Sequence, residues 1–86
     1  MRTGPIVITR GVAALRQDPI YETWLNVCLQ RYNSGDWGDL CQEDQQLNDQ
    51  AIKQGGRILA RYNNSAGDVY IITDGGGTTV LLTDEY

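Results

Sequence analysis

The sequence predicts an α+β fold, with two main helices packed on one face of an antiparallel three-stranded meander and an N-terminal strand joining the sheet. Apolar residues follow helical spacing from residue 19 to residue 52, and they alternate with a period of two from residue 57 onward. Short turns rich in glycine and asparagine separate three strand-like runs at the C-terminal end. Because the connections between these runs are short, we expect the strands to be antiparallel neighbours.

Length and composition indicate a single domain, residues 1–86, because so short a chain has too little apolar material for a second core. No apolar run approaches the ~20 residues of a membrane span, so we expect a soluble, cytoplasmic protein with no membrane partner. The two cysteines, Cys28 and Cys41, are expected to be unpaired, half-buried residues of adjacent helices.

The first half of the chain contains a short strand and a well-marked helix. The run PIVIT (5–9) is typical of an edge strand, since Pro5 at its start needs no ladder donor, and GVAALRQ (11–17) predicts one or two helical turns. Asp18 and Pro19 have the order of an N-cap and a first helical residue, and Gly35 suits the left-handed position after the helix. The helix over 19–32 carries two overlapping stripes, one of Ile20, Trp24, Val27, Cys28 and Arg31 and one of Tyr21, Leu25, Cys28, Leu29 and Tyr32.

The second half predicts another helix and then the meander. Asp39 stands three residues before Gln42, as in a capping box, so the helix is expected to start there and to end at Gln54-Gly55-Gly56. Its apolar side carries Leu40, Leu47, Ala51 and Ile52, and its outer face is acidic. The strands are expected over 57–63, 68–73 and 78–83, with turns at 64–67 and 74–77.

The two tryptophans are the largest apolar groups of a chain without phenylalanine, so Trp24 and Trp37 are expected to anchor the contact between helix and sheet. Trp37 lies between two glycines, and it has two interpretations. The favoured one is a core anchor in a tight turn. The alternative is an exposed aromatic that faces a partner and is flanked by Asp36 and Asp39.

The stretch YNSGDWGDLCQEDQQLNDQ (32–50) holds five carboxylates and no basic residue, which raises the question of a metal or catalytic site. An EF-hand pattern starting at Asp36 fails because Gly38 and Leu40 occupy ligand positions. A looser Mg²⁺ or Ca²⁺ site from Asp36, Asp39 and Glu43 is an alternative. We favour helix capping and a solvated surface, and we expect no metal, no cofactor and no catalytic residue.

The residues that are missing exclude whole classes of chemistry. The chain has no histidine, which removes the commonest general base and every Ser-His or Cys-His arrangement. Its only lysine, Lys53, stands in no P-loop motif. The net charge is −4 and the seven basic residues are dispersed, so direct binding to nucleic acid is not expected. The sequence therefore predicts a protein that is not an enzyme.

Several segments carry a family resemblance over residues 35–86: GDWGDL (35–40), ED followed by ND and A (43–51), G-x-RILA-x-Y (55–62), YIIT (70–73) and TTVLL ending in EY (78–86). Together they resemble small uncharacterised "plasmid-related" proteins carried by bacterial plasmids, phages and integrative elements. The resemblance implies a setting among the accessory proteins of mobile genetic elements. This chain departs from the family pattern at Tyr70, at the turn 74–77 and at Thr83-Asp84, which puts a shared ligand at that turn in doubt.

The leading hypothesis is a non-enzymatic accessory protein that binds a protein partner of unknown identity. The expected binding surface combines the acidic helix with the tryptophan turn through Asp36, Trp37, Asp39, Glu43 and Asp44. Three alternatives stay open: an acidic mimic of DNA that uses the five acids of residues 36–49, a small enzyme or ligand-binding module that uses Asp36, Asp39, Glu43 and Tyr62, and a homodimer formed through an open sheet edge.

Overall fold

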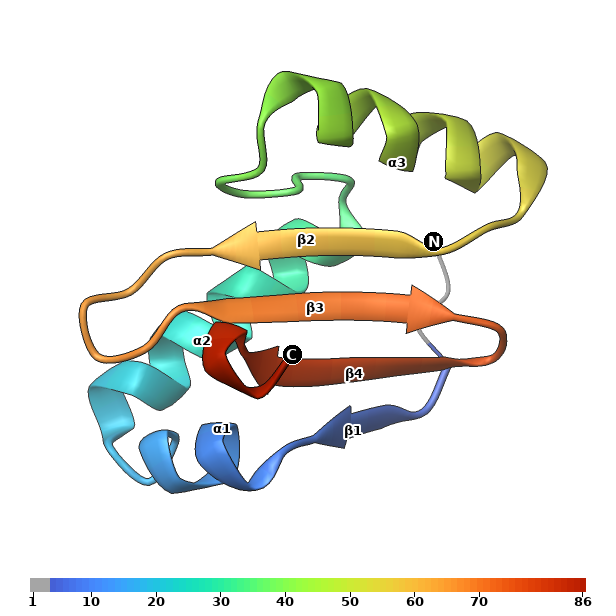
Figure 1. Cartoon of the computed structure of the whole chain (residues 1–86). Helices are drawn as coiled ribbons and strands as arrows, with labels where there is room; N and C mark the ends of the chain where they lie inside the picture. The colour runs from blue at the N-terminus through green and yellow to red at the C-terminus, as the bar shows by residue number, and fades with distance from the viewer. Residues whose placement is uncertain (1–3) are drawn as a thin grey trace.

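The computed structural model describes residues 4–86 and shows an α+β fold with a sheet, three α-helices and a short C-terminal 3-10 helix (Figure 1). The order along the chain is β1 (Ile6–Ile8), α1 (Arg10–Leu15), α2 (Pro19–Asn33), α3 (Gln42–Gln54), β2 (Ile58–Tyr62), β3 (Val69–Asp74), β4 (Gly77–Leu82) and η1 (Thr83–Glu85).

The sheet has four strands in the order β1-β4-β3-β2. Strands β2, β3 and β4 form the predicted antiparallel meander, but β1 joins the outer side of β4 in a parallel direction. The sheet is therefore mixed, and the expectation of a purely antiparallel meander describes only three of its strands. The parallel pair follows from the path of the chain. After β1 the three helices carry the chain to the far edge of the sheet, where it enters β2 parallel to β1. The two reversals of the meander then bring β4 beside β1 in the same direction.

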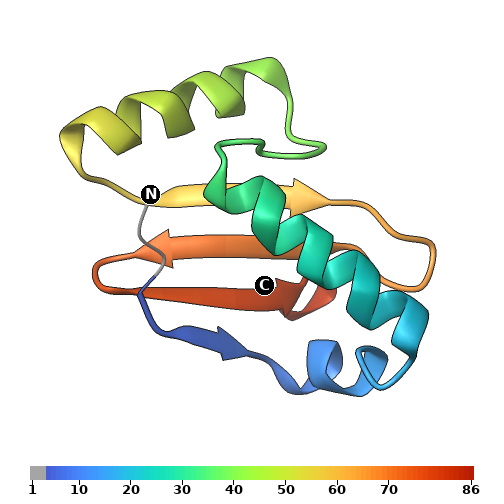
Figure 2. The ribbon, with the colours of Figure 1, turned by 180° about the vertical axis from the view of Figure 1, so that it is seen from behind.

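Helix α2 crosses one face of the sheet, as seen from behind in Figure 2, and supplies most of the helical side of the core. As predicted, the Asp18 carboxylate accepts a hydrogen bond from the N–H of Ile20 at 2.9 Å, and Pro19 opens the helix. The second of the two predicted stripes is the buried one. Ile20, on the first stripe, is 81% exposed. The buried residues of α2 are Tyr21, Leu25, Cys28 and Tyr32.

The sheet face below α2 is buried by the alternation that the sequence predicts. The core is not entirely apolar, because two threonines lie within it. The hydroxyl of Tyr32 donates to Thr73 Oγ1 at 2.7 Å, and Thr73 and Thr78 share a further 2.7 Å hydrogen bond. These hydroxyls satisfy one another away from water. The apolar residues of the sheet in this core are Ile58, Ala60, Tyr62, Val69, Ile71 and Val80.

Helix α3 lies beside the outer edge of β2 instead of on the face that α2 covers (Figures 1 and 2). Its one buried residue is Asn48, whereas Leu47 is 61% and Ile52 is 48% exposed. The prediction of two helices on one face is thus wrong for α3. The side chain of Asn48 donates to the carbonyl of Leu59 at 2.5 Å and accepts from its N–H at 3.1 Å. It takes the place of a neighbouring strand there.

The C-terminal 3-10 helix η1 lies next to the start of α1 and is hydrogen-bonded to it through Glu85. The Glu85 carboxylate accepts hydrogen bonds from the hydroxyl of Thr9 at 2.6 Å, from the N–H of Gly11 at 3.2 Å and from the N–H of Leu82 at 2.8 Å. These contacts, the one to Thr9 first, hold the pKa of Glu85 below its usual value. Residues far apart in the sequence thereby close one end of the sheet.

Candidate functional site

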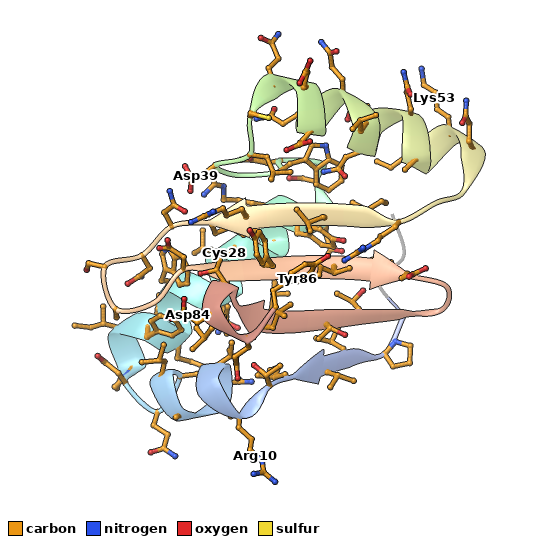
Figure 3. The ribbon with its side chains drawn as sticks, in the orientation of Figure 1. Arg10, Cys28, Asp39, Lys53, Asp84 and Tyr86 are labelled. Atoms are coloured by element: carbon orange, nitrogen blue, oxygen red, sulfur yellow. The ribbon has the colours of Figure 1, made fainter. Side chains whose placement is uncertain are left out.

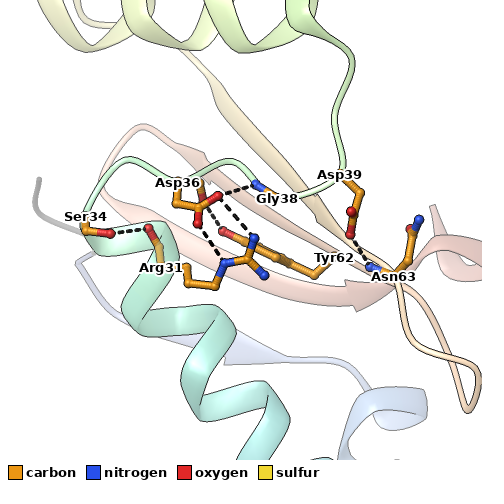
Figure 4. A network of polar contacts seen from close by, with 7 residues as sticks. All are labelled: Arg31, Ser34, Asp36, Gly38, Asp39, Tyr62 and Asn63. Atoms are coloured by element: carbon orange, nitrogen blue, oxygen red, sulfur yellow. Dashed lines mark hydrogen bonds and ion pairs between the residues drawn. The ribbon is translucent and has the colours of Figure 1, made fainter.

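The turn between α2 and α3 uses Asp36 as a structural anchor (Figure 4). Arg31 makes two hydrogen bonds to the Asp36 carboxylate, from Nε at 2.8 Å and from its terminal nitrogen at 3.3 Å, and the N–H of Gly38 adds a third at 3.0 Å. The ion pair with Arg31 and the Gly38 N–H lower the pKa of this carboxyl group. The backbone carbonyl of Asp36 accepts from the hydroxyl of Tyr62 at 2.6 Å. Asp36 therefore organises the turn.

Trp37 belongs to the core, with 3% of its surface exposed. Its ring meets that of Tyr32 edge-on, with centroids 5.5 Å apart, and its Nε1 donates to Asp49 Oδ1 at 3.1 Å. The interpretation of Trp37 as a core anchor is confirmed, and the exposed, partner-facing alternative is wrong. Trp24 is only partly buried, against the ring of Tyr21.

Asp39 is not the N-cap of α3. The helix begins at Gln42 with Cys41 at the N-cap position, and no side chain caps it. The Asp39 carboxylate instead accepts from the N–H of Asn63 at 2.9 Å, while its own N–H donates to the carbonyl of Arg61 at 2.6 Å. The chain after Trp37 therefore pairs with β2 over a short distance, in the parallel direction. Because these residues are extended, α3 begins only at Gln42.

Glu43 and Asp44 lie in the first turn of α3 and are exposed, where negative charge stabilises the N-terminal end of a helix. Asp44 Oδ2 accepts from the thiol of Cys41 at 3.2 Å. The five predicted partner-binding residues thus differ in their burial and in the groups they contact. Within residues 4–86, no group of three or more His, Cys, Asp or Glu residues is placed to hold a metal ion.

The cysteines are unpaired, as expected, but they are not alike. Cys28 is buried within α2, and burial raises the pKa of its thiol to about 11. Cys41 is exposed just before α3. The buried thiol stays protonated at neutral pH and packs as a small apolar group.

A groove that the sequence did not predict lies between α3 and the sheet face opposite α2. It consists of two adjoining hollows, of about 280 Å³ and about 330 Å³, which share Leu40, Asp44 and Leu59 in their linings. The first hollow extends toward Asp39 and the second toward Leu47. The groove exists because α3 lies along the edge of β2 and the face of the sheet opposite α2 carries only the short 3-10 helix η1 (Figures 1 and 2).

Four side chains contact one another in a row along this face, with two tyrosines between two arginines, and form what we term the Arg-Tyr ladder: Arg57, Tyr86, Tyr70 and Arg61. The guanidinium of Arg57 lies 5.6 Å from the Tyr86 ring centroid, the two tyrosine rings meet edge-on at 5.4 Å, and the guanidinium of Arg61 lies 5.7 Å from the Tyr70 centroid. Tyr86 lies in front of the sheet in Figure 3, at the first hollow. The ladder gives the groove an amphipathic wall of aromatic rings and guanidinium groups.

The charges of the groove are unevenly compensated. Arg61 is paired with Asp68 at 3.2 Å, and Arg57 donates to the hydroxyl of Tyr86 at 2.5 Å. The ion pairs among residues 4–86 include neither Asp39 nor Asp44. Asp39 and Asp44 therefore have no cation within ion-pair distance among residues 4–86, although Arg61 lines the first hollow with both of them and Arg57 lines the second with Asp44.

The alternation of Arg57, Leu59 and Arg61 placed these side chains together on one face of β2, but nothing in the sequence indicated that α3 would leave that face open. Among residues 4–86, no helix combines the length and apolar character of a membrane crossing. The chain matches no protein-family model, and no curated protein or solved structure matches it significantly.

Proposed function

We propose that this protein is a non-enzymatic binding module whose groove between α3 and the uncovered sheet face receives an extended segment of a protein partner. The observation that carries this proposal is the pairing of an apolar floor, Leu40 and Leu59, with two carboxylates, Asp39 and Asp44, that lack a cationic partner among residues 4–86. Such an arrangement suits a lysine or arginine next to an aliphatic residue.

The wall of the groove supports a peptide occupant over a small ligand. Tyr70 and Tyr86 present rings with few rotatable bonds, which give contact area at low entropic cost. The two hollows continue one another along β2, as a chain segment requires, and neither is enclosed. The resemblance to plasmid-related proteins favours placing the module among the accessory proteins of a mobile genetic element.

The proposed surface differs from the one predicted from the sequence. It keeps Asp39 and Asp44 and loses Trp37, which is buried, and Asp36, whose charge is paired with Arg31. Glu43 lies outside the lining of both hollows and contributes only to the negative field around them.

Selection from a random peptide library displayed on phage tests the proposal. We expect the selected peptides to combine a basic residue with an adjacent aliphatic one, and their affinity to fall several-fold when salt rises from about 50 mM to about 300 mM. Asp44→Lys should weaken binding about tenfold, because it replaces attraction by repulsion inside the groove. Asp84→Lys makes the same change in net charge outside the groove and is the matched control.

A second matched pair tests the apolar lining of the second hollow. Leu47→Asn changes an exposed leucine of the second hollow, whereas Ile52→Asn changes an exposed isoleucine of the same helix that does not line the groove. Only the first substitution should reduce peptide affinity. Selected peptides without basic residues, or equal losses within either pair, would refute the groove as the binding site, and protection of a nuclease substrate by the wild type would favour the DNA-mimic alternative.

A further inference from the structure

The two edges of the sheet differ in how their backbone groups are satisfied. At the β2 edge, Asn48 binds both backbone groups of Leu59, and the segment beside it binds both backbone groups of Arg61: the Arg61 N–H donates to Trp37 at 3.3 Å, and its carbonyl accepts from Asp39 at 2.6 Å. This edge is closed to a further strand.

The opposite edge is β1, and its backbone is arranged for another strand. The N–H of Thr78 donates to the carbonyl of Pro5 at 2.9 Å, and the N–H of Thr9 donates to the carbonyl of Val80 at 3.1 Å. Since backbone groups alternate along a strand, residues 5, 7 and 9 turn toward β4, and Ile6 and Ile8 turn their N–H and C=O groups outward. Val7 is 61% exposed, and no charged side chain interrupts the strand.

We propose that the β1 edge pairs with the β1 edge of a second copy of this chain, antiparallel across a two-fold axis that passes between the two Val7 residues. The sequence Ile6-Val7-Ile8 is symmetric about its centre. Antiparallel pairing therefore places each Ile6 opposite Ile8 of the second copy and each Val7 opposite its own equivalent, which is the self-complementarity that an isologous interface requires.

The alternation of inward and outward backbone groups along β1 agrees with this register. Ile6 and Ile8 face each other with their outward N–H and C=O groups and exchange both hydrogen bonds, while the Val7 pair occupies the closer position without backbone bonds. Pro5 then lies opposite Thr9 of the second copy, where both residues direct their backbones toward their own sheets. The missing N–H of Pro5 leaves no bond unmade at the interface.

A second copy fits this edge better than a longer foreign strand. Helix α1 begins at Arg10 and Gly4 has a left-handed φ of +64°, so the extended segment is confined to a few residues. A partner of the same short length pairs with all of it, and the two sheets join into one continuous sheet. The dimer leaves the groove beside α3 at the far edge of each copy, so it does not depend on the proposed function.

Light scattering over about 10 µM to about 1 mM protein tests the proposal in the range where weak dimers dissociate. The wild type is expected to reach twice the 9.6 kDa mass of one chain. Val7→Lys and Val7→Glu should each be monomeric, because they place like charges directly opposite each other across the axis. Val27→Lys, at an exposed position of α2, is the control and should dimerise as the wild type does.

Mixing the two Val7 variants provides the decisive measurement. Equal amounts of Val7→Lys and Val7→Glu should form a heterodimer, since opposite charges then face each other, and circular dichroism should show both variants folded because Val7 is exposed. A monomeric wild type, a Val7→Lys variant that still dimerises, or a mixture that stays monomeric would each overturn the proposal.

Discussion

At the scale of single residues, Asn48 does what β2 otherwise needs another strand to do. A side-chain amide carries a donor and an acceptor at the spacing of a peptide group, so it satisfies both backbone groups of Leu59. Its position on α3 also attaches that helix to the sheet. A polar residue in the middle of a weakly apolar helix is here the residue that fixes the helix in place.

Asn48→Ala is therefore expected to lower the free energy of unfolding by about 2 kcal/mol. Two hydrogen bonds are lost, and the partly buried N–H and C=O groups of Leu59 are left without a partner. Urea unfolding followed by circular dichroism measures the change. Gln50→Ala, at an exposed position of the same helix, is the control and should leave stability unchanged or slightly higher. Equal effects of the two substitutions would show that Asn48 does not hold the edge.

Gly38 is the second residue on which the turn depends. It has a left-handed φ of +72°, and a Cβ added to it would overlap the carbonyl of Arg61 and the ring of Tyr62. Gly35 is also left-handed, with φ +87°, but a Cβ there meets open space. The two positions thus share the backbone conformation and differ only in their surroundings.

We expect Gly35→Ala to lower the free energy of unfolding by about 1 kcal/mol, the usual cost of a left-handed alanine. Gly38→Ala should lower it by about 2 kcal/mol more, because steric overlap adds to the same backbone term. Denaturation midpoints of the two variants measure this difference. If they agree, the close approach of the turn to β2 is absent in solution.

At the scale of elements, α2 and α3 are held by different means. Helix α2 buries four residues against the sheet, whereas α3 buries only Asn48 and packs Ala51 partly. Since helical stability in proteins comes mostly from packing, α3 is expected to open locally while α2 stays folded.

Native-state hydrogen exchange should show this order directly. For amides of α2 and β3, the free energy of opening measured by exchange is expected to equal that of global unfolding. For amides of α3 it should be markedly smaller. In Asn48→Ala the protection of α3 should fall further while that of α2 follows the change in global stability. Equal protection of α2 and α3 would contradict the assignment of α3 as a separately opening element.

At the scale of the whole molecule, the shifted pKa values set the pH range of stability. The pKa values of Asp36 and Glu85 are lowered, by Arg31 and by Thr9 respectively, so these carboxylates stabilise the fold above their unfolded pKa values of about 4 and lose that contribution as pH falls through the lower folded values. Burial raises the pKa of Tyr21 to about 12 and that of Cys28 to about 11. Their contribution is present below their unfolded pKa values and is lost as pH rises through the folded ones.

Stability is accordingly expected to be flat between about pH 5 and pH 8 and to decline on both sides. Urea midpoints measured from pH 2 to pH 12 test this profile. Glu85→Gln should flatten the acidic limb, because the uncharged amide no longer titrates, and Glu43→Gln at an exposed position is the control. An acidic limb that is the same in both variants would contradict the role of Glu85 in fastening α1.

Much of the local structure followed from the sequence because it depends on neighbouring residues. Asp18 and Pro19 marked the start of α2, and the three later strands lie within a residue or so of their predicted bounds. The alternation from residue 57 onward also separated the side chains of β2 into two faces, and the structure buries the face of Ile58, Ala60 and Tyr62. These features rest on backbone conformation and on the periods of helix and strand.

The position of α3 and the partners of its neighbouring carboxylates could not be predicted from the sequence. Asp39 and Gln42 have the spacing of a capping box, yet Asp39 binds Asn63, a residue 24 positions away. Leu47 and Ile52 suggested a buried stripe, and the burial of Asn48 overrode it. Each of these outcomes is decided by a partner that is distant in sequence, which local patterns do not encode.

By itself the sequence determined the α+β class and the extent of most elements. Only the tertiary structure decided that Trp37 is buried, that β1 runs parallel to β4, and that one sheet edge is closed while the other faces outward. The reason is physical: local conformation is set by adjacent residues, whereas the faces and edges left open depend on which distant segments meet across the core.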